Sequence, residues 1–163
     1  MAGAGNGKLS PLTVYEPLCL PLTTIADGRG FASYDLFALA ESYGIQIDNS
    51  GQVNATTTYP GIKRGWHRHK EQFDCMAVVF GDAIVAAWKM VDSSREEIES
   101  KIFYIGEHNP SLVIIPPGWW HGLTPVGGKP CLMIYYVSNK FDPAKPDEER
   151  LPYDDHDSPK LLE

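Results

Sequence analysis

Short segments rich in β-branched and aromatic residues follow one another along most of the 163-residue chain. Glycine, proline, asparagine and aspartate separate these segments, and such residues mark turns. Residues 52–59 alternate like a strand with one buried face, whereas 83–91 are almost all apolar, like a strand buried on both faces. The expected strands are 33–39, 43–47, 52–59, 73–80, 83–91, 101–105, 111–115 and 131–137. This pattern predicts an all-β fold, an antiparallel β-sandwich or jelly-roll barrel.

Short helical turns interrupt the strand pattern. Residues 37–44 and 93–100 have helical character, and 147–151 can form one short helix. The length suits one domain better than two. We expect a single domain over 1–163, divided into a flexible start (1–11), a core of about 12–138 and a tail (139–163).

The C-terminal tail is rich in charge. It holds four basic and eight acidic residues, so it carries −4 of the net charge of −7. Tails of this kind are usually solvated, although they can also fold over the mouth of a barrel.

Charge and composition exclude several classes of partner. A net charge of −7 argues against nucleic acid or an anionic membrane surface. A small anionic ligand stays compatible with it, because a few arginines can bind phosphate on an acidic protein. No apolar run is long enough to span a membrane, and residues 1–10 lack the apolar segment of a signal peptide. The three cysteines form no CxxC pair, so we expect a cytoplasmic protein with reduced thiols.

Two histidine motifs concentrate the chemistry of the chain. His67 and His69 are two residues apart, so a strand would turn both to one face, and Asp74 follows five residues later. The second motif is Pro116-x-Gly118-x-x-His121. Three imidazoles and one carboxylate suit Fe, Mn, Ni, Cu or Zn. A plain alternative is that these groups are hydrogen-bonded structural residues with no ligand.

The spacing of the two motifs resembles that of the cupin superfamily. The first motif, framed by Gly61 and Gly81, carries Asp74 where glutamate is usual. The second carries Pro125 where asparagine is usual. The resemblance implies a cupin jelly-roll barrel with the two motifs on neighbouring strands.

A more specific resemblance is to the dTDP-4-dehydrorhamnose 3,5-epimerase family, a metal-free branch of the cupins. Gln52, Asn54, Thr56, Thr58, Gly61, Arg64, Gly65 and His67 match the spacing of that family's signature. DGRGF (27–31), IPPGWWHG (115–122), IYYVSNKFDP (134–143) and LPYDD (151–155) are similar to its further motifs, in the same order. The matches extend from about residue 27 to 155.

The resemblance implies proton transfer next to the C4 ketone of a 4-keto-6-deoxy sugar nucleotide, in a homodimer without a cofactor. His67 would be the base on one face of the sugar, and Tyr135 the acid on the other. Tyr136 is the alternative to Tyr135, because strand register decides which tyrosine faces the site. The implied substrate-binding residues are Arg29 and Arg64, for the diphosphate, and Gln52, Asn54, Thr58 and His121.

The chain departs from this family at the centre of the site. Asp74 stands where the family has a lysine that helps to hold the developing oxyanion, and a carboxylate would repel it. His69 stands at a position that is typically not histidine. Together these two changes rebuild the metal cage of the wider superfamily from His67, His69, Asp74 and His121. A metal-bound His67 could not also be a free base.

Further departures lie outside this cluster. Ala32 and Tyr34 replace an aromatic residue and an acid, and Phe141 replaces a tyrosine near the ligand. The family orients its histidine base with a C-terminal aspartate, for which Asp154, Asp155 and Asp157 are candidates here.

Three functions are therefore compatible with the sequence. The first is a metal-free epimerase or isomerase that acts on a nucleotide sugar. The second is a metal-dependent small cupin, a dioxygenase or isomerase, that uses His67, His69, Asp74 and His121. The third is a cupin that binds a small ligand without catalysis.

Overall fold

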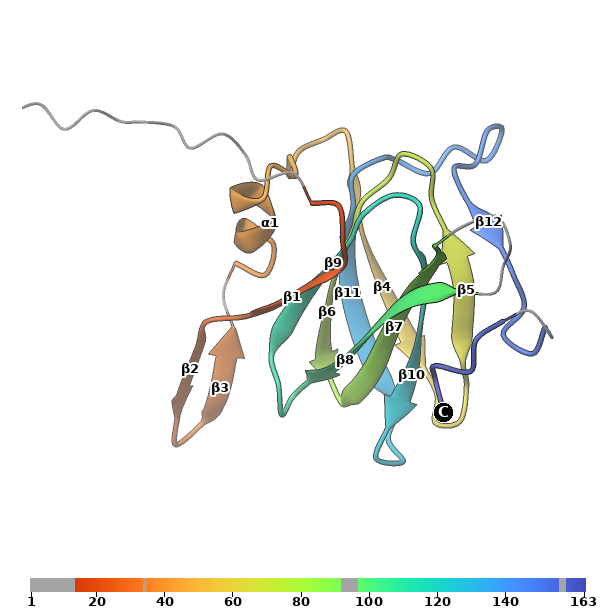
Figure 1. Ribbon diagram of the computed structural model, residues 1–163. Helices are drawn as coiled ribbons and strands as arrows, with labels where there is room; N and C mark the ends of the chain where they lie inside the picture. The colour runs from red at the N-terminus through yellow and green to blue at the C-terminus, as the bar shows by residue number, and fades with distance from the viewer. Residues whose placement is uncertain (1–13, 34, 92–96, 156–157) are drawn as a thin grey trace, which may run out of the picture.

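The computed structural model describes residues 14–33, 35–91, 97–155 and 158–163, and strands dominate them (Figure 1). The strands are β1 (Leu18–Pro21), β2 (Thr24–Asp27), β3 (Gly30–Ser33), β4 (Gln52–Thr58), β5 (Arg64–Arg68), β6 (Asp74–Phe80), β7 (Asp82–Met90), β8 (Ile98–Gly106), β9 (Ser111–Ile115), β10 (Trp120–Val126), β11 (Cys131–Val137) and β12 (Glu149–Arg150). One helix, α1 (Ala38–Ser42), lies among them. The expected all-β jelly roll with short helical turns is confirmed.

Two five-stranded antiparallel sheets form the barrel. One has the order β1-β9-β6-β11-β4 and the other β12-β5-β10-β7-β8. The two histidine motifs meet in the second sheet, because β5 and β10 are neighbours there. Strands β4, β6 and β11 face them from the first sheet. The candidate site residues on these strands therefore face one another between the sheets.

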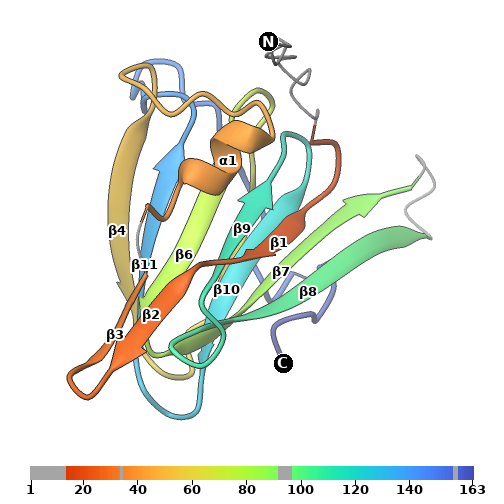
Figure 2. The same cartoon turned by 90° about the vertical axis from the view of Figure 1, so that its left-hand side faces the viewer.

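Apolar side chains fill three regions, one between the sheets and one on the outer face of each. Val85 and Val113 belong to the cluster between the sheets. Ala40 and Ile45 join a second cluster, because α1 covers the outer face of the first sheet (Figure 2). Leu162 belongs to the third, on the outer face of the second sheet. Strands with both faces covered need apolar residues at successive positions, which explains the apolar run of 83–91.

Several expected elements differ from the structure. Residues 35–39 and 43–47 are not strands: a turn at 36–37 leads into α1, and 45–47 have no regular structure. Ser33 ends β3, and residue 34 lies outside the described residues. These segments are apolar because they cover the first sheet. The helical character of 37–44 is confirmed by α1. Strands β1, β2, β3, β5, β10 and β12 were not among the eight expected.

The expected helices at 93–100 and 147–151 are wrong where the structure describes them. Ile98–Ser100 begin β8, and the preceding 92–96 lie outside the described residues. Glu149–Arg150 form β12 because this edge pairs with β5. Trp66 and Leu151 also exchange two backbone hydrogen bonds, of 2.7 and 2.9 Å. Ladder bonds outweigh the helical preference of a five-residue segment, since so short a helix is marginal alone.

The structure describes most of the C-terminal tail but not the first residues of the chain. The expected flexible start, 1–11, lies outside the described residues. The tail folds back over β5, and Leu161 and Leu162 pack against the third apolar cluster.

No helix within the described ranges is long and apolar enough to cross a membrane.

Two glycines hold the motif strands in place. Gly118 has a φ of +86°, a left-handed conformation that glycine adopts without strain, and this allows the turn before β10. A Cβ at Gly122 would collide with the Arg64 carbonyl and lie 2.8 Å from the Gly65 Cα. Glycine at 122 therefore lets β5 and β10 approach closely enough to bring the histidines together.

Candidate active site

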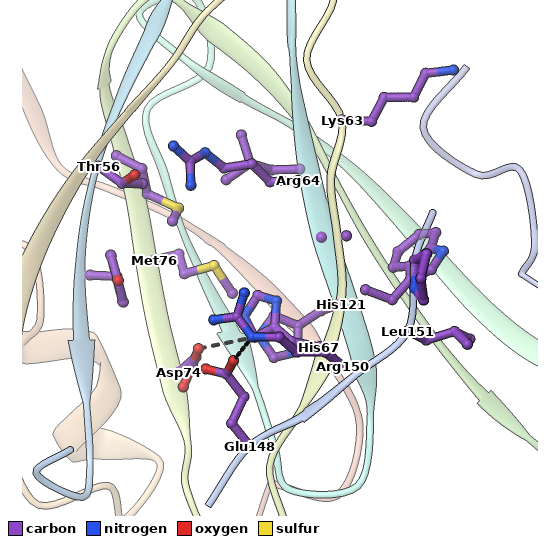
Figure 3. A pocket seen from close by; sticks show the side chains of 17 residues that line it. Thr56, Lys63, Arg64, His67, Asp74, Met76, His121, Glu148, Arg150 and Leu151 are labelled. Carbon is purple, nitrogen blue, oxygen red and sulfur yellow. Dashed lines mark hydrogen bonds and ion pairs between the residues drawn. The ribbon is translucent and has the colours of Figure 1, made fainter. Parts of the chain in front are cut away.

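The four predicted cage residues meet at one point between the sheets. His67 lies in β5 and His69 immediately follows that strand. Asp74 lies at the start of β6 and His121 in β10. One potential ligand atom from each lies within 4.8 Å of the others. The ring centroids of His67 and His121 are 4.0 Å apart, and His69 lies 5.6 and 5.8 Å from them. Figure 3 shows Asp74 pointing toward the rings of His67 and His121.

Hydrogen bonds to backbone carbonyls orient two of the imidazoles. The His121 Nδ1 lies 3.1 Å from the Trp119 carbonyl, and the His69 Nδ1 contacts the Asp147 carbonyl. A carbonyl only accepts, so both Nδ1 atoms carry the proton. The Nε2 atoms then face the Asp74 Oδ2, at 3.2 Å from His121 and 3.7 Å from His69. Metal-ligating histidines are commonly oriented through the other ring nitrogen in this way.

The contact between His121 and Asp74 requires a positive charge. A neutral His121 that is protonated at Nδ1 presents a lone pair at Nε2, and a carboxylate oxygen is also an acceptor. Two acceptors at 3.2 Å repel each other unless His121 is an imidazolium or a cation lies beside both. The side chains of both residues are almost fully buried, so their charges are weakly screened.

The protonation states of the cluster follow from burial and these neighbours. Burial, followed by the nearby His121, holds the pKa of His67 well below its usual value, so His67 is neutral. Burial alone would raise the pKa of Asp74. The hydrogen bond with His121 and the electrostatic effect of the neighbouring imidazoles, that of His121 first, outweigh burial and keep that pKa below its ordinary value. Asp74 is therefore an anion, as a metal ligand or an ion-pair partner must be.

A cavity of about 450 Å³ opens beside the cluster. His67, Asp74 and His121 line its deep polar end, and Met76, Leu123 and Met133 give it an apolar wall. Arg64 and Lys63 lie at the side away from Asp74 (Figure 3). The cavity falls within the usual size range for small-molecule sites.

Strand register separates the two candidate tyrosines. Tyr135 lines the cavity, whereas Tyr136 points to the opposite face of β11. The Tyr136 hydroxyl donates to the Gln46 carbonyl at 2.9 Å, so its role is structural. Burial and then Asp74 raise the pKa of Tyr135, which keeps its hydroxyl protonated.

The polar residues of β4 have separate positions along the strand. Gln52, Asn54, Thr56 and Thr58 alternate with exposed residues and turn toward the interior. Thr56 lines the cavity, although it was not among the implied substrate-binding residues. Thr58 is buried and accepts a bond of 2.9 Å from the Arg64 Nε, so it orients that arginine. The amide of Gln52 donates to Asn54 at 2.9 Å, and Asn54 pairs with Tyr135 across β4 and β11.

Arg29 lies apart from this cavity. It sits in the turn of the β2–β3 hairpin, which extends away from the barrel (Figure 1). There it pairs with Asp27 at 2.5 Å and lines a separate surface hollow of about 320 Å³.

Asp154, Asp155 and Phe141 do not line the cavity either. Phe141 is exposed, and its N–H donates to Gln52. Asp154 and Asp155 are absent from the cavity lining, and Asp157 lies outside the described residues.

The tail supplies site residues that sequence reasoning missed. Glu148, Arg150, Leu151 and Pro152 line the cavity, and Glu148 forms an ion pair with Arg150 (Figure 3). Lys63 was missed as well. One feature of the sequence could have indicated the tail residues: Leu151 is apolar within a charged segment. An edge strand needs such an apolar side chain to pack against the barrel.

Comparisons with known proteins agree with this architecture. The structure superimposes on a dTDP sugar isomerase from Desulfovibrio desulfuricans G20 with a TM-score of 0.74, 22% identity and 93% coverage of both chains. For the dTDP-4-dehydrorhamnose 3,5-epimerase from Sulfolobus tokodaii the TM-score is 0.66, with 24% identity and coverage of 84% of this chain and 77% of the other. The fold is therefore shared with these two sugar-nucleotide enzymes.

Sequence comparisons identify the family. The profile described as "Polysaccharide biosynthesis C-terminal domain" matches residues 38–149. The spore coat polysaccharide biosynthesis protein SpsL of Bacillus subtilis (strain 168) is 34% identical over 130 residues, which cover 80% of this chain and 83% of SpsL. The probable low-salt glycan biosynthesis epimerase Agl13 of Haloferax volcanii is 43% identical over 98 residues, 60% of this chain and 63% of Agl13. The chain belongs to the polysaccharide biosynthesis C-terminal domain family.

Proposed function

We propose that this protein is an epimerase that acts on the carbons beside the ketone of a 4-keto-6-deoxy sugar nucleotide. The observation that carries the proposal is that His67 and Tyr135 line one cavity from opposite sheets. A neutral imidazole and a protonated phenol are the forms that a base and an acid need at neutral pH. The similarity to Agl13, a probable epimerase, and to structures of dTDP-sugar epimerases supports the same reaction class.

The proton transfers follow from this arrangement. The His67 imidazole takes the proton from the carbon next to the ketone, and the electron pair of the C–H bond moves into an enolate. The Tyr135 hydroxyl then gives a proton to the other face of that carbon, which inverts it. The enolate oxygen needs a positive partner, because this C–H acid is weak. The His121 side of the cluster provides one if its imidazole is protonated.

Arg64 supports binding of the diphosphate. Its Nε bonds with Thr58 and its second guanidinium nitrogen with the Thr57 carbonyl at 3.2 Å, so the side chain is oriented before a ligand arrives. Lys63 adds a second cation to the same part of the cavity. A guanidinium presents paired N–H donors that match phosphate oxygens. The sugar would then lie at the histidine end of the cavity.

A second candidate is a metal-assisted form of the same enzyme. The geometry of the cluster favours it. Backbone carbonyls orient the imidazoles of His69 and His121 so that their Nε2 atoms point toward the buried carboxylate of Asp74. The donor set of His67, His69, Asp74 and His121 fits a divalent Fe, Mn, Ni, Cu or Zn ion. Such an ion would supply Lewis-acid polarisation of the ketone oxygen. His67 would then be a ligand, and Tyr135 would remain as a proton donor in the cavity.

Elemental analysis and a conversion assay separate these candidates. Protein purified without a metal-chelate column should contain about one metal ion per chain if the second candidate is correct. No bound metal, even after metal is added back, leaves the metal-free mechanism with His67 as the base. Conversion of dTDP- or UDP-linked 4-keto-6-deoxy sugars, followed by proton NMR, tests both. Ligand binding without conversion by any form would instead indicate a binding protein without catalysis.

We further propose that the protein acts as a homodimer in the cytoplasm. An isolated two-stranded hairpin is only marginally stable, and β2–β3 exposes Ile25 and Phe31. A second copy would cover these side chains. Light scattering of the wild type and of a Phe31→Ser variant tests this: a monomeric wild type would contradict it. Three free cysteines fit a reducing compartment.

A further inference from the structure

The carboxylate of Asp147 binds three successive backbone N–H groups of the loop between β5 and β6. It accepts from Lys70 at 2.8 Å, from Glu71 at 2.9 Å and from Gln72 at 3.1 Å. The backbone carbonyl of the same residue accepts from the His69 Nδ1. One residue of the tail therefore holds every position of the chain from 69 to 72.

The loop that Asp147 holds carries the supports of Asp74. The Gln72 amide donates to the Asp74 Oδ1 at 2.6 Å, and the His69 Nε2 lies 3.7 Å from the Asp74 Oδ2. Asp147 thus anchors both Gln72, which positions one oxygen of the central carboxylate, and His69, which faces the other oxygen. The carbonyl of His69 also accepts from Gly118 at 2.8 Å, which links this loop to the second histidine motif.

Further contacts hold the segment that follows Asp147. Glu149 pairs with Arg68 at 2.6 Å and with Lys70 at 3.2 Å, and β12 pairs with β5. A loop cap alone would need only the carboxylate. Here the main chain of the capping residue binds a side chain of the cluster directly, which a purely structural cap does not require.

We propose that Asp147 is a positioning residue for the His69–Asp74 side of the site. Its carboxylate fixes the loop, and its carbonyl holds His69 as the Nδ1–H tautomer with the Nε2 lone pair directed into the cluster. Asp147 acts through His69 and Gln72. The inference rests on the proposed function only for its effect on turnover, because the tautomer is a property of the resting protein.

The test is nitrogen-15 NMR of the imidazoles in the full-length protein at neutral pH. The His69 signals are assigned with a His69→Gln variant. We expect His69 in the wild type to carry its proton at Nδ1, and Asp147→Ala to give a mixture of tautomers. Asp142→Ala is the matched control, because it removes the same charge from the same tail, and the Asp142 carboxylate accepts from Ala144 and not from the loop between β5 and β6. It should leave His69 unchanged.

A wild-type His69 that is protonated at Nε2 would overturn the inference, and so would an Asp147→Ala variant with wild-type His69 signals. Asp147→Asn keeps the size of the side chain and guards against a folding failure of the alanine variant. It should give an intermediate shift of the tautomer populations. In the conversion assay, Asp147→Ala should lower kcat about ten-fold with little change in KM. An inactive wild type with the expected tautomer would sink the proposed function but leave this inference standing.

Discussion

His67 and His121 face each other across the β5–β10 pair, with ring centroids 4.0 Å apart. At this separation two imidazolium charges would repel each other strongly in a buried site. The low pKa of His67 makes it the neutral member of the pair. Asp74 contacts His121, the other member of the pair, at 3.2 Å. The pair thus joins a potential base and a potential electrostatic stabiliser on two neighbouring strands.

The two adjacent tyrosines of β11 should respond differently to the loss of their hydroxyls. Tyr135→Phe removes the acid from the cavity, so we expect turnover to fall about 100-fold or more with unchanged stability. Tyr136→Phe removes hydrogen bonds at the opposite face, so we expect a loss of about 1 kcal/mol in the free energy of unfolding with activity retained. Conversion assays and urea unfolding measure both. Equal activity of the two variants would contradict the assignment.

Arg64 should determine the affinity for the anionic part of the substrate. Arg64→Gln removes a charge-assisted bond to phosphate, worth about 1.5–3 kcal/mol, so KM should rise by roughly 10- to 100-fold. The change in kcat should be small, because the arginine lies away from Asp74 (Figure 3). Lys129→Gln, an exposed charge in the β10–β11 turn, is the control. A variant with unchanged KM and reduced kcat would place Arg64 at the reacting end instead.

The close approach of β5 and β10 should be intolerant of a methyl group. In Gly122→Ala the new Cβ meets the backbone of Arg64 and Gly65, which cannot rotate away. We expect a loss of about 1–3 kcal/mol in the free energy of unfolding, typical of overpacking, together with loss of activity. Gly28→Ala has open space around its Cβ and should be nearly neutral. Thermal unfolding of both variants would settle this, and equal melting temperatures would contradict the geometry.

Asp82 should make stability depend on pH in the acid range. It accepts from the His108 N–H at 3.1 Å and lies 2.7 Å from the His108 Nδ1. Burial opposes its ionisation, but these bonds lower the pKa of Asp82 below its ordinary value. A group with a depressed folded-state pKa stabilises the fold above its unfolded pKa of about 4, and this contribution disappears as the pH falls through the folded value.

Asp82→Ala should therefore cost about 1 kcal/mol at pH 7, and the difference from the wild type should shrink as the pH falls below about 4. Urea unfolding at a series of pH values between 7 and 3 measures this difference. A gap that stays constant across the series would show that the charge of Asp82 is irrelevant.

Sequence reasoning located the centre of the site because its geometry is local to strands. His67 and His69 share a face through the two-residue period, and the motif around His121 carries the glycine that its turn requires. The expected all-β fold followed from turn residues between apolar segments. By contrast, the segments at 33–39 and 43–47 have the composition of strands but serve as a cover, and composition alone does not separate these roles.

The contribution of the tail could not be predicted for a different reason. Residues 147–151 look helical, yet β12 forms because the edge of β5 offers unpaired backbone groups. The contact of Asp147 with His69 is made by a main-chain carbonyl. Because every residue has such a carbonyl, no pattern of side chains predicts this contact. The choice between Tyr135 and Tyr136 likewise depended on register, which the paired strands determine.

The most direct test of the proposed reaction is solvent deuterium exchange into a 4-keto-6-deoxy sugar nucleotide, followed by NMR. With wild-type enzyme in heavy water, and with metal supplied if the protein binds it, we expect deuterium at the carbons that flank the ketone. Tyr135→Phe should slow formation of the epimerised product. No exchange by the wild type with either dTDP- or UDP-linked sugars would contradict proton transfer at this site and leave a protein that binds its ligand without this chemistry.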